Sequence, residues 1–406
     1  MSWEMVPFES VYSEPSRNGV YKPAEHHGSG AKIVNMGELF AHEFIGAQEM
    51  SRLRMSDAEL EKAGLIEGDL LFGRRSLVES GAGKCSVVEG VTEPLTFESS
   101  IIRVRTDMNL VVPRFLYYWF KSRLGRGSIR AIVSGTNVKG IRGSDLKKVL
   151  VPRPKTQVQE AIACELSAYD NLIENNRRRI ALLEQSARLL YREWFAHLRF
   201  PGHEHVKVVD GVPEGWSRSP IRSRFKTVLG GTPSRKRAEY WEGGTIPWIN
   251  SGMVNEIRIV VPSELITPLA LAESAAKLMP AKTTVLAITG ATLGQVSMLE
   301  IECAANQSVV GVTDESDLLS EYIYLCLKDR AKELIALGTG GAQIHINKEV
   351  VNAFEVLLPD DALAREFTDF VKPTFSQVTC LAMTNFRLEM ARDLLLPRLM
   401  SGDLVV

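Results

Sequence analysis

The stretch from Gln157 to Ala196 reads QVQEAIACELSAYDNLIENNRRRIALLEQSARLLYREWFA, and it sets the architecture of the chain. Its apolar residues recur at alternating intervals of four and three, which is the spacing of a coiled-coil seam. The positions between them are mostly polar, so the pattern predicts a helix with one apolar stripe that needs a partner helix. At ~1.5 Å per residue, a helix of about 40 residues is ~60 Å long. The residues expected to pair along this seam are Ile162, Leu166, Tyr169, Ile173, Asn176, Ile180, Leu183, Leu190 and Trp194.

One polar residue, Asn176, stands on the predicted seam. A polar residue at such a position commonly fixes the register of two helices, at some cost in stability. An asparagine that is merely tolerated beside solvent would give the same pattern. Both interpretations stay open at this point.

A second helical pattern, from Ala362 to Met400, is the natural partner of the first. We expect the two helices to pair antiparallel. Pro373 should kink or break the second helix, because proline lacks a backbone donor and clashes with the preceding turn. The apolar residues at approximate helical spacing are Leu363, Phe367, Phe370, Val378, Leu381, Leu388, Ala391, Leu395 and Leu399.

Each long helix follows a segment that occurs twice in the chain. The second copy lies roughly 205 to 215 residues after the first, and a repeat of this length identifies the structural unit. Each copy contains short strand-like runs between Gly-rich turns, which predicts a globular α+β unit. The matched stretches are Val34–Gly37 with Ile249–Gly252, Gly83–Val87 with Gly294–Met298, Ser100–Val104 with Ser308–Val312, and Phe115–Lys121 with Tyr322–Lys328.

We therefore expect an α+β fold in which two tandem α/β domains are separated by two long antiparallel coiled-coil helices. The expected boundaries are 1–153 for the first domain, 154–200 for the central helix, 201–216 for a turn-rich linker, 217–359 for the second domain and 360–406 for the C-terminal helix. His203 and His205 lie in the linker without a third candidate ligand nearby, so we predict a solvated loop there and no metal site.

The composition is that of a globular chain. Its 406 residues suggest two to four domains, with 45% hydrophobic and 24% charged residues. No apolar run approaches the ~18 residues of a membrane span, and Glu4 and Glu9 occupy a region where a signal peptide would be basic and then apolar. We expect a cytoplasmic protein that does not enter a membrane. The five widely spaced cysteines are predicted to be small core residues.

The net charge of −1 hides a strong sorting of charge along the sequence. Between Arg103 and Lys148 there are 11 basic and 2 acidic residues, and between Arg222 and Arg237 there are 6 basic residues and no acidic one. Two basic surfaces would suit a polyanion such as nucleic acid. Ordinary solvated charged faces would give the same counts.

The sequence lacks the motifs of the enzymes that act on DNA or nucleotides. The P-loop candidate at Gly83-Lys84 fails, because Cys85 follows it and Val78 stands where the first glycine is required. The chain contains no Pro-Pro pair, which excludes the usual amino-methyltransferase motif, and no lysine follows a glutamate at the spacing of a common nuclease site. We predict a binding protein with no catalytic residue of its own.

Several stretches carry a resemblance to a known family. They are Gly230-Gly231-Thr232-Pro233-Ser234, Tyr240-Trp241, Ile246–Ile249, Ala287–Val296, Ile346-Asn347-Lys348 before Leu357–Pro359, and Leu394–Asp403. In these stretches the chain resembles the specificity (S) subunits of type I DNA restriction-modification systems. The first half departs from the pattern, because Pro15-Ser16-Arg17 stands where the Gly-Thr-Pro-Ser turn is expected.

The resemblance implies two target-recognition domains, each reading one part of a bipartite, asymmetric site in double-stranded DNA. It also implies that the helices set the gap between the two parts and dock two methyltransferase (modification) subunits. Restriction and translocase subunits complete such complexes. S-adenosylmethionine, ATP and Mg are then expected in the partner subunits, and no cofactor is expected in this chain.

Candidate DNA contacts follow from side-chain chemistry. Basic side chains position a protein on phosphates, whereas arginine and amide side chains read guanine and adenine edges. The phosphate candidates are Arg74, Arg75, Lys84, Lys139, Arg142, Lys147 and Lys148 in the first domain, and Arg235, Lys236, Arg237, Lys282 and Lys348 in the second. The base-reading candidates are Ser234, Asn250, Ser251, Thr289, Gln295, Gln343 and His345.

Two other interpretations remain beside this one. The chain would also suit a DNA-recognition adaptor of a related defence methyltransferase, or a two-headed coiled-coil scaffold that binds proteins instead of DNA. Asn250 is a weaker candidate than the others, because Asn35 recurs at the matching place and suits a shared structural turn.

Overall fold

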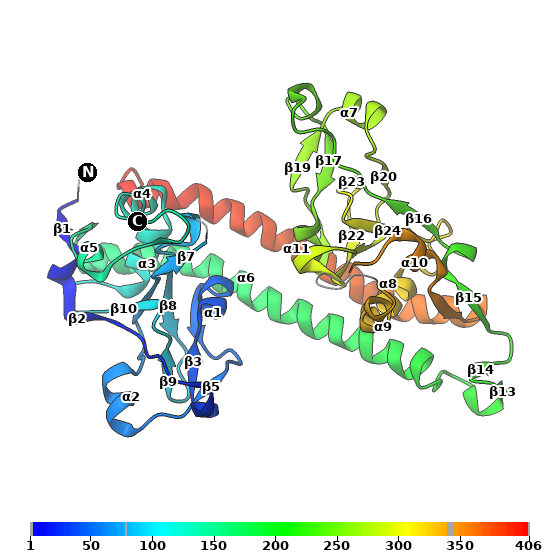
Figure 1. Cartoon of the computed structure of the whole chain (residues 1–406), viewed down its shortest axis with the longest axis horizontal. Coiled ribbons are helices and arrows are strands. Elements are labelled where there is room, and N and C mark those ends of the chain that lie inside the picture. The colour runs from blue at the N-terminus through cyan, green and yellow to red at the C-terminus, as the bar shows by residue number, and fades with distance from the viewer. Residues whose placement is uncertain (1–2, 78, 339–344, 405–406) are drawn as a thin grey trace. The chain divides into compact units, whose positions relative to one another are not determined.

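The computed structural model describes residues 3–77, 79–338 and 345–404 (Figure 1). The chain divides into two compact units: Met1–Leu172 with Leu388–Val406, and Ile173–Arg387. Two long helices, α6 (Thr156–Tyr191) and α11 (Asp361–Ser401), each contribute to both units. Each unit therefore contains one globular head, called here the first or the second head, and a segment of both helices.

The first head is built on a five-stranded sheet in the order β2-β10-β6-β8-β4. Strand β4 is parallel to β8, and the other neighbours are antiparallel. A second sheet, β5-β3-β9, shares a hydrophobic core with it through Phe97 and Leu71. The strands are β1 (Met5–Pro7), β2 (Tyr12–Asn18), β3 (His27–Val34), β4 (Phe44–Gly46), β5 (Arg52–Leu53), β6 (Leu70–Gly73), β7 (Arg75–Ser76), β8 (Cys85–Glu89), β9 (Leu95–Phe97), β10 (Ile101–Thr106), β11 (Lys139–Gly140) and β12 (Leu150–Pro152). The helices are α1 (Met36–Ala41), α2 (Asp57–Ala63), α3 (Pro113–Lys121), α4 (Arg123–Arg130) and α5 (Gly143–Leu146).

The second head repeats this arrangement. Its five-stranded sheet has the order β16-β24-β21-β22-β18, again with one parallel pair, β18 with β22, and a second sheet has the order β19-β17-β23-β20. The strands are β13 (Val208–Val209), β14 (Val212–Pro213), β15 (Ser217–Pro220), β16 (Lys226–Leu229), β17 (Ile246–Ile249), β18 (Arg258–Ile259), β19 (Glu264–Ile266), β20 (Leu278–Met279), β21 (Thr284–Ala287), β22 (Val296–Leu299), β23 (Cys303–Ala305), β24 (Val309–Thr313) and β25 (Glu355–Leu358). The helices are α7 (Pro268–Glu273), α8 (Ser320–Asp329), α9 (Ala331–Ala336) and α10 (Lys348–Ala353).

The two heads confirm the predicted duplication, since their five-stranded sheets match in strand order and direction. In each head an early strand also pairs with the strand that directly precedes the long helix, β1 with β12 and β15 with β25. These pairings join the start of each head to the start of the helix that follows it. The predicted α+β fold with two tandem α/β domains and two long helices is confirmed.

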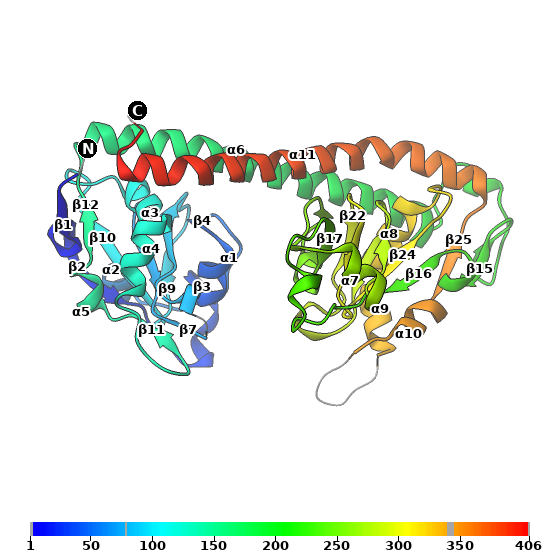
Figure 2. The same cartoon turned by 90° about the horizontal axis from the view of Figure 1, so that it is seen from above.

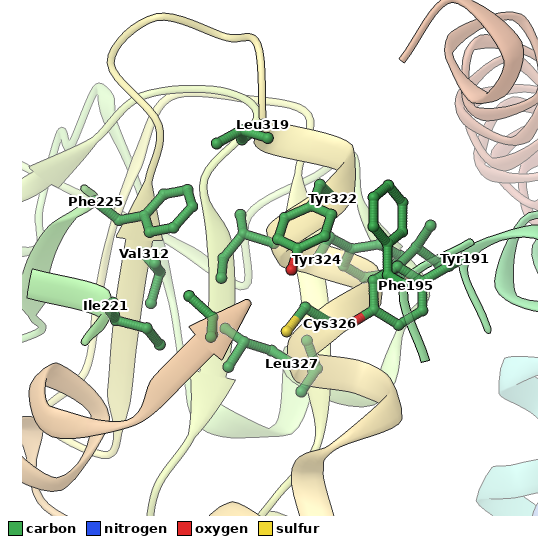
Figure 3. Close-up of a cluster of buried hydrophobic side chains, with 14 of the residues drawn as sticks. Tyr191, Phe195, Ile221, Phe225, Val312, Leu319, Tyr322, Tyr324, Cys326 and Leu327 are labelled. Atoms are coloured by element: carbon green, nitrogen blue, oxygen red, sulfur yellow. The ribbon is translucent and has the colours of Figure 1, made fainter. Parts of the chain in front are cut away.

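One helix in each head is buried on all sides. Residues Phe115 to Phe120 of α3 and Ser320 to Leu327 of α8 are all buried. A helix is apolar all round only where neighbours cover every face. In the second unit, Tyr322 of α8 packs against Tyr191 and Phe195, while sheet residues such as Val312 belong to the same core (Figure 3).

The long helices run antiparallel within each unit. In the first unit, Ile162 and Leu166 share a core with Leu396 and Leu399. In the second unit, the buried Asn176 Nδ2 donates to Asn385 Oδ1 at 2.9 Å, and further along α6 the Trp194 ring meets Phe367. Later residues of α6 therefore contact earlier residues of α11, as expected for antiparallel helices (Figure 2). Every residue expected on the first seam is buried or half-buried.

For the second helix, the predicted break at Pro373 and the predicted seam position of Phe370 are wrong. Helix α11 continues through Pro373 without a break. Pro373 and Asp369, whose carbonyl loses its usual partner, both lie on the exposed face, where water can replace the missing bond. Phe370 is 61% exposed, and the buried stripe instead includes Val371 and Phe375. Phe370 and Val371 are adjacent apolar residues, and placing the larger one on the seam gave the wrong helical phase.

The cysteine prediction is also partly wrong. Cys85, Cys303 and Cys326 are buried, but Cys164 and Cys380 are exposed on the faces of the long helices that lie away from the seam. Among the described residues, no group of three or more His, Cys, Asp or Glu side chains is placed to hold a metal ion. Within the same part of the chain, no helix combines the length and apolarity needed to cross a bilayer.

Ion pairs connect the first head to its helices through the half-buried Glu43 and the buried Arg392 and Asp170. The Glu43 carboxylate beside β4 lies 2.5 Å from Lys121 Nζ of α3 and 3.8 Å from Arg392 Nη1 of α11. Arg392 also contacts Asp170 of α6 at 2.5 Å, and Tyr118 donates to Asp170 at 2.6 Å. Burial opposes the charge on Glu43, but Lys121 outweighs it, so the pKa of Glu43 falls below its usual value. The head supplies the carboxylate and α11 supplies the guanidinium.

The second unit has the same kind of contact with the signs exchanged. Arg258, the first residue of β18, is buried with its Nη2 3.6 Å from the Glu184 carboxylate of α6. Its guanidinium lies 4.4 Å from the ring centroids of both Tyr324 and Phe375. Tyr324 donates to Glu184, and Lys328 Nζ lies 3.1 Å from it. Here the helix supplies the carboxylate and the head supplies the guanidinium.

Candidate nucleic-acid interface

In each five-stranded sheet, the loops that carry most candidate residues lie at the same end of the strands. In the first head, Ile102 pairs with Asn18, Ile101 with Gly73, and Phe72 with Cys85. The loops that leave these strand ends form what we call the first loop edge. The second loop edge is defined by the same register in the second head, where Leu229, Ala287, Val296 and Val309 lie at the strand ends.

The first loop edge brings basic residues together from distant parts of the sequence. Strand β7 pairs with β11 so that Lys139 faces Ser76 and Gly140 faces Arg75. Ile141 N donates to Arg74 O at 3.0 Å, which places Arg142 beside the same strand. Four candidates, Arg74, Arg75, Lys139 and Arg142, therefore share one end of the sheet. Arg17, which is not among the residues predicted from the sequence, lies exposed near the end of β2 at the same edge.

The side chains at this edge differ in what they already bind. Among the described residues, no ion pair is found for Arg74, Arg75, Lys139, Arg142 or Lys148. Lys139 Nζ donates to Gly135 O at 2.9 Å, and so keeps its charge near the loop. Lys147 is paired with Glu9 at 2.9 Å. Lys84 donates to Phe40 O at 2.5 Å, and burial lowers the pKa of its ammonium group.

The basic run of the second head is largely neutralised, contrary to expectation. Arg235 makes a two-point contact with Glu264 at 2.5 and 2.7 Å and stacks on Trp241 at 3.6 Å. The hydrogen bonds from Arg235 also hold the pKa of Glu264 below its usual value. Arg237 lies 2.8 Å from both Glu239 and Glu273. Glu264 and Glu273 are distant from this basic run in the sequence and come into contact with it only in the folded chain.

Two more basic residues of that run are paired as well. Arg224 contacts Asp314 at 2.6 Å, and Lys226 contacts Glu315 at 3.0 Å. Lys236 is exposed, and no ion pair is found for it in the part of the chain that the structure describes. The guanidinium donors that Arg235 uses to bind Glu264 are those that would bind a guanine or a phosphate. Glu264 must therefore move before Arg235 can bind either.

The second loop edge is instead lined mainly by uncharged polar side chains. Thr289 follows β21, Gln295 directly precedes β22, and a turn at Gly290 connects them. Ile346 N donates to Ile288 O at 3.0 Å, which brings the exposed His345 beside Thr289. Lys348 is the half-buried first residue of α10. Ser234 is exposed in the loop after β16, and Gln343 lies outside the described residues.

Three candidates have structural roles or lie elsewhere. Asn250 Oδ1 accepts from Gly252 N at 2.8 Å and caps the turn Ser251–Asn255, so Ser251 is also part of that turn. Asn35 caps α1 at the matching place in the first head. Lys282 lies at the opposite end of β21, where its Nζ is 2.7 Å from Glu300.

The alignment of the first-head turn needs correction. Gly19 N donates to Ile101 O at 3.2 Å and Gly230 N donates to Val309 O at 2.9 Å, so Gly19 is the counterpart of Gly230. A Cβ at either glycine would lie 2.1 Å from a backbone oxygen, which only glycine avoids. The expected counterpart, Pro15–Arg17, is wrong by a few residues. The Asn-Gly pair at Asn18-Gly19 was the available signal.

A duplicated head with a polar loop edge, docked on antiparallel helices, defines a class of two-headed binding proteins. The family model described as "Type I restriction modification DNA specificity domain" matches residues 43–185 and 213–378. The chain therefore belongs to this family.

Individual relatives agree with the family assignment. The chain is 27% identical over 394 residues to the type I restriction enzyme MjaIX specificity subunit of Methanocaldococcus jannaschii, covering 95% of this chain and 89% of the relative. It is 24% identical over 440 residues to the HindI specificity subunit of Haemophilus influenzae, covering 92% and 94%. The crystal structure of a type I S subunit from M. genitalium matches with a TM-score of 0.57 and 16% identity, over 98% of this chain and 96% of that one. That match supports the fold.

Proposed function

We propose that this chain is the DNA-recognition subunit of a type I restriction-modification complex and that it reads a bipartite, asymmetric site in double-stranded DNA. The observation that carries the proposal is the duplicated loop edge. The same strand ends present basic side chains in one head and uncharged polar side chains in the other. Two different reading surfaces on one frame suit a site whose two halves differ.

Each loop edge is proposed to contact one half-site. Loops at strand ends reach base edges more readily than strand residues, whose side chains pack the core. Arg75 and Arg142 are exposed and have donors for guanine or for phosphate, while Thr289, Gln295 and His345 suit hydrogen bonds to bases. Asn250, Ser251 and Lys282 become weaker candidates because each already has a structural role or lies away from the edge.

The helices are proposed to set the gap between the half-sites and to dock two methyltransferase subunits. In this assignment residues 1–153 and 217–359 are the recognition domains, 154–200 and 360–406 are the spacers, and 201–216 is the linker. Catalysis belongs to the partners: methylation with S-adenosylmethionine in the modification subunits, and ATP- and Mg-dependent translocation and cleavage in the restriction subunits. We place the assembly in the cytoplasm, where chromosomal DNA is accessible.

The proposal is tested with the chain assembled with its methyltransferase subunits. Comparing the methylome of a host with and without this chain identifies the recognised sequence, and footprinting of the complex on that duplex then shows the contacts. We expect two protected blocks separated by an unprotected gap. Absence of sequence-specific binding would favour the protein-scaffold interpretation instead.

The spacer role has its own test. Seven residues are inserted after Leu172 in α6 and seven after Arg387 in α11, which preserves the heptad phase of both helices. The insertion adds about 10 Å of helix at ~1.5 Å per residue. Since bases on one strand are spaced ~3.4 Å apart along the duplex, we expect the preferred gap to lengthen by about three base pairs. An unchanged gap would contradict a spacer role.

A further inference from the structure

The two loop edges differ systematically in charge at equivalent positions. Gly73 pairs with the first residue of β10, and Ala287 pairs with the first residue of β24, so Gly73 and Ala287 are counterparts. Two residues further on, the first head has Arg75 and the second has Thr289. A cation in one head is thus replaced by a neutral hydroxyl in the other.

Two more positions show the same replacement. The residue directly before β8 is Lys84, and the residue directly before β22 is Gln295. The residue that precedes α5 is Arg142, and the residue that precedes α10 is Asn347. At each of these equivalent positions the backbone fold is the same, but only the side chain of the first head is positively charged.

Carboxylates widen this difference between the heads. In the second head, Arg235 and Arg237 are held by three glutamates at 2.5 to 2.8 Å. In the first head, Glu98 accepts from Met36 N at 2.7 Å and Glu79 lies 3.9 Å from Arg130, so neither pairs with Arg75 or Arg142. The first loop edge therefore keeps more uncompensated positive charge than the second, where Lys236 and Lys348 remain without an ion pair among the described residues.

We propose that the first head supplies most of the electrostatic attraction to the DNA phosphates, while the second head holds its half-site mainly through uncharged groups. This inference rests on the proposed function and adds a division of labour to it. Each phosphate neutralised by a protein cation releases counterions, so it contributes about 0.9 to the slope of log K against log salt. Uncharged hydrogen bonds to bases contribute little to that slope. The salt dependence of binding should therefore come from the first loop edge.

The test compares two matched pairs of substitutions in the full complex, on a duplex that carries the methylome-defined site. The first pair is Arg75→Gln with Arg142→Gln. The second is Lys236→Gln with Lys348→Gln, which also removes two positive charges that have no ion pair among the described residues. Binding constants are measured between about 50 and 200 mM salt, the range over which phosphate contacts are readily distinguished. Thermal melts of each variant check that folding is intact.

We expect the first pair to reduce the slope by about 1.8, for two phosphates at about 0.9 each, and the second pair to reduce it by less than half of that. Equal reductions, or a larger one from the second pair, would overturn the inference while leaving DNA recognition intact. Failure of the wild-type complex to bind the duplex at low salt would overturn the proposed function as well.

A charge-conserving variant separates phosphate attraction from base reading. Arg75→Lys with Arg142→Lys keeps both charges but removes the forked guanidinium donors that grip guanine. We expect the slope of this variant to equal that of the wild type. A slope as low as that of the glutamine pair would show that geometry matters instead of charge, and would contradict the inference.

Discussion

The first and second units share a frame but use opposite charges at the place where each head meets the helices. In the first unit Glu43 of the head faces Arg392 of α11, and in the second unit Arg258 of the head faces Glu184 of α6. The loop edges diverge as well, since the first carries more unpaired basic side chains than the second, which is mainly uncharged. Strand order and turn glycines define the backbone fold that the two heads share, whereas the charged residues on that fold differ between the heads.

The largest expected effect comes from removing the buried guanidinium of the second unit. Arg258→Met leaves the buried Glu184 and Glu300 without that partner, and breaking a buried ion pair in this way costs about 3–5 kcal/mol. Urea denaturation followed by tryptophan fluorescence reports mainly on this unit, which contains Trp194, Trp216, Trp241 and Trp248.

The matched control is Arg392→Met in the first unit. Hydrogen exchange should then show loss of protection in the first unit with Arg392→Met and in the second with Arg258→Met. A denaturation midpoint for Arg258→Met equal to that of the wild type would contradict the importance of the second contact.

A smaller effect is expected at the polar layer of the helix pair in the second unit. Asn385→Ala leaves the buried Asn176 amide without its partner, which costs about 1–3 kcal/mol. Replacing both residues, as in Asn176→Leu with Asn385→Leu, removes the unpaired group and should restore most of the lost stability. Urea midpoints of the two variants decide the matter. A double variant no more stable than Asn385→Ala would show that the pair does more than satisfy two amides.

Glu321 in the second head occupies the position of Arg114 in the first, and there its charge is a liability. It is 1% exposed, its Oε2 has no hydrogen-bond partner in the part of the chain that the structure describes, and burial raises the pKa of its carboxyl. A carboxyl with a raised folded pKa lowers stability as the pH rises through that pKa. We expect Glu321→Gln to gain about 1 kcal/mol at pH 8, or about 2–4 °C in Tm, and nothing at pH 4. A gain at both pH values would rule out the titration.

The smallest effect is expected at Glu43, whose carboxylate is partly exposed. Its lowered folded pKa means that its contribution to stability is present above the unfolded value of 4.5 and is lost as the pH falls through the folded value. Glu43→Gln should therefore lower Tm slightly at pH 7 and leave it unchanged at the acid end. Thermal melts of the full chain between pH 7 and the acid end check the sign of this effect. A larger loss at low pH would contradict it.

Local patterns made much of the fold predictable. The seam from Ile162 to Trp194 and the four repeated stretches were sufficient for the helices and the duplication, because both are encoded by spacing along the chain. Phe370 was misplaced because adjacent apolar residues leave the helix phase ambiguous. The turn at Gly19 is misaligned because glycine is required there by the close approach of the distant Phe97 carbonyl, whereas the Asn-Gly pair signals only that a turn is present.

The candidate site was less predictable than the fold. The acid-free run from Arg222 to Arg237 suggested a basic surface, but Glu264, Glu273 and Asp314 reach it only after folding. Conversely, Arg75 and Lys139 are brought together by a strand pair that joins residues more than sixty positions apart. Charge along a sequence predicts surface charge only where the fold brings no partners.

The central claim is that each loop edge reads its own half of one site. The direct measurement is methylome sequencing of a host that carries the wild-type chain, Arg75→Ala, or Gln295→Ala, together with the methyltransferase subunits. We predict that Arg75→Ala relaxes or reduces methylation according to bases in one half of the motif, and that Gln295→Ala does so in the other half. Changes in the same half for both variants, or an unaltered motif with full methylation for both, would contradict the account.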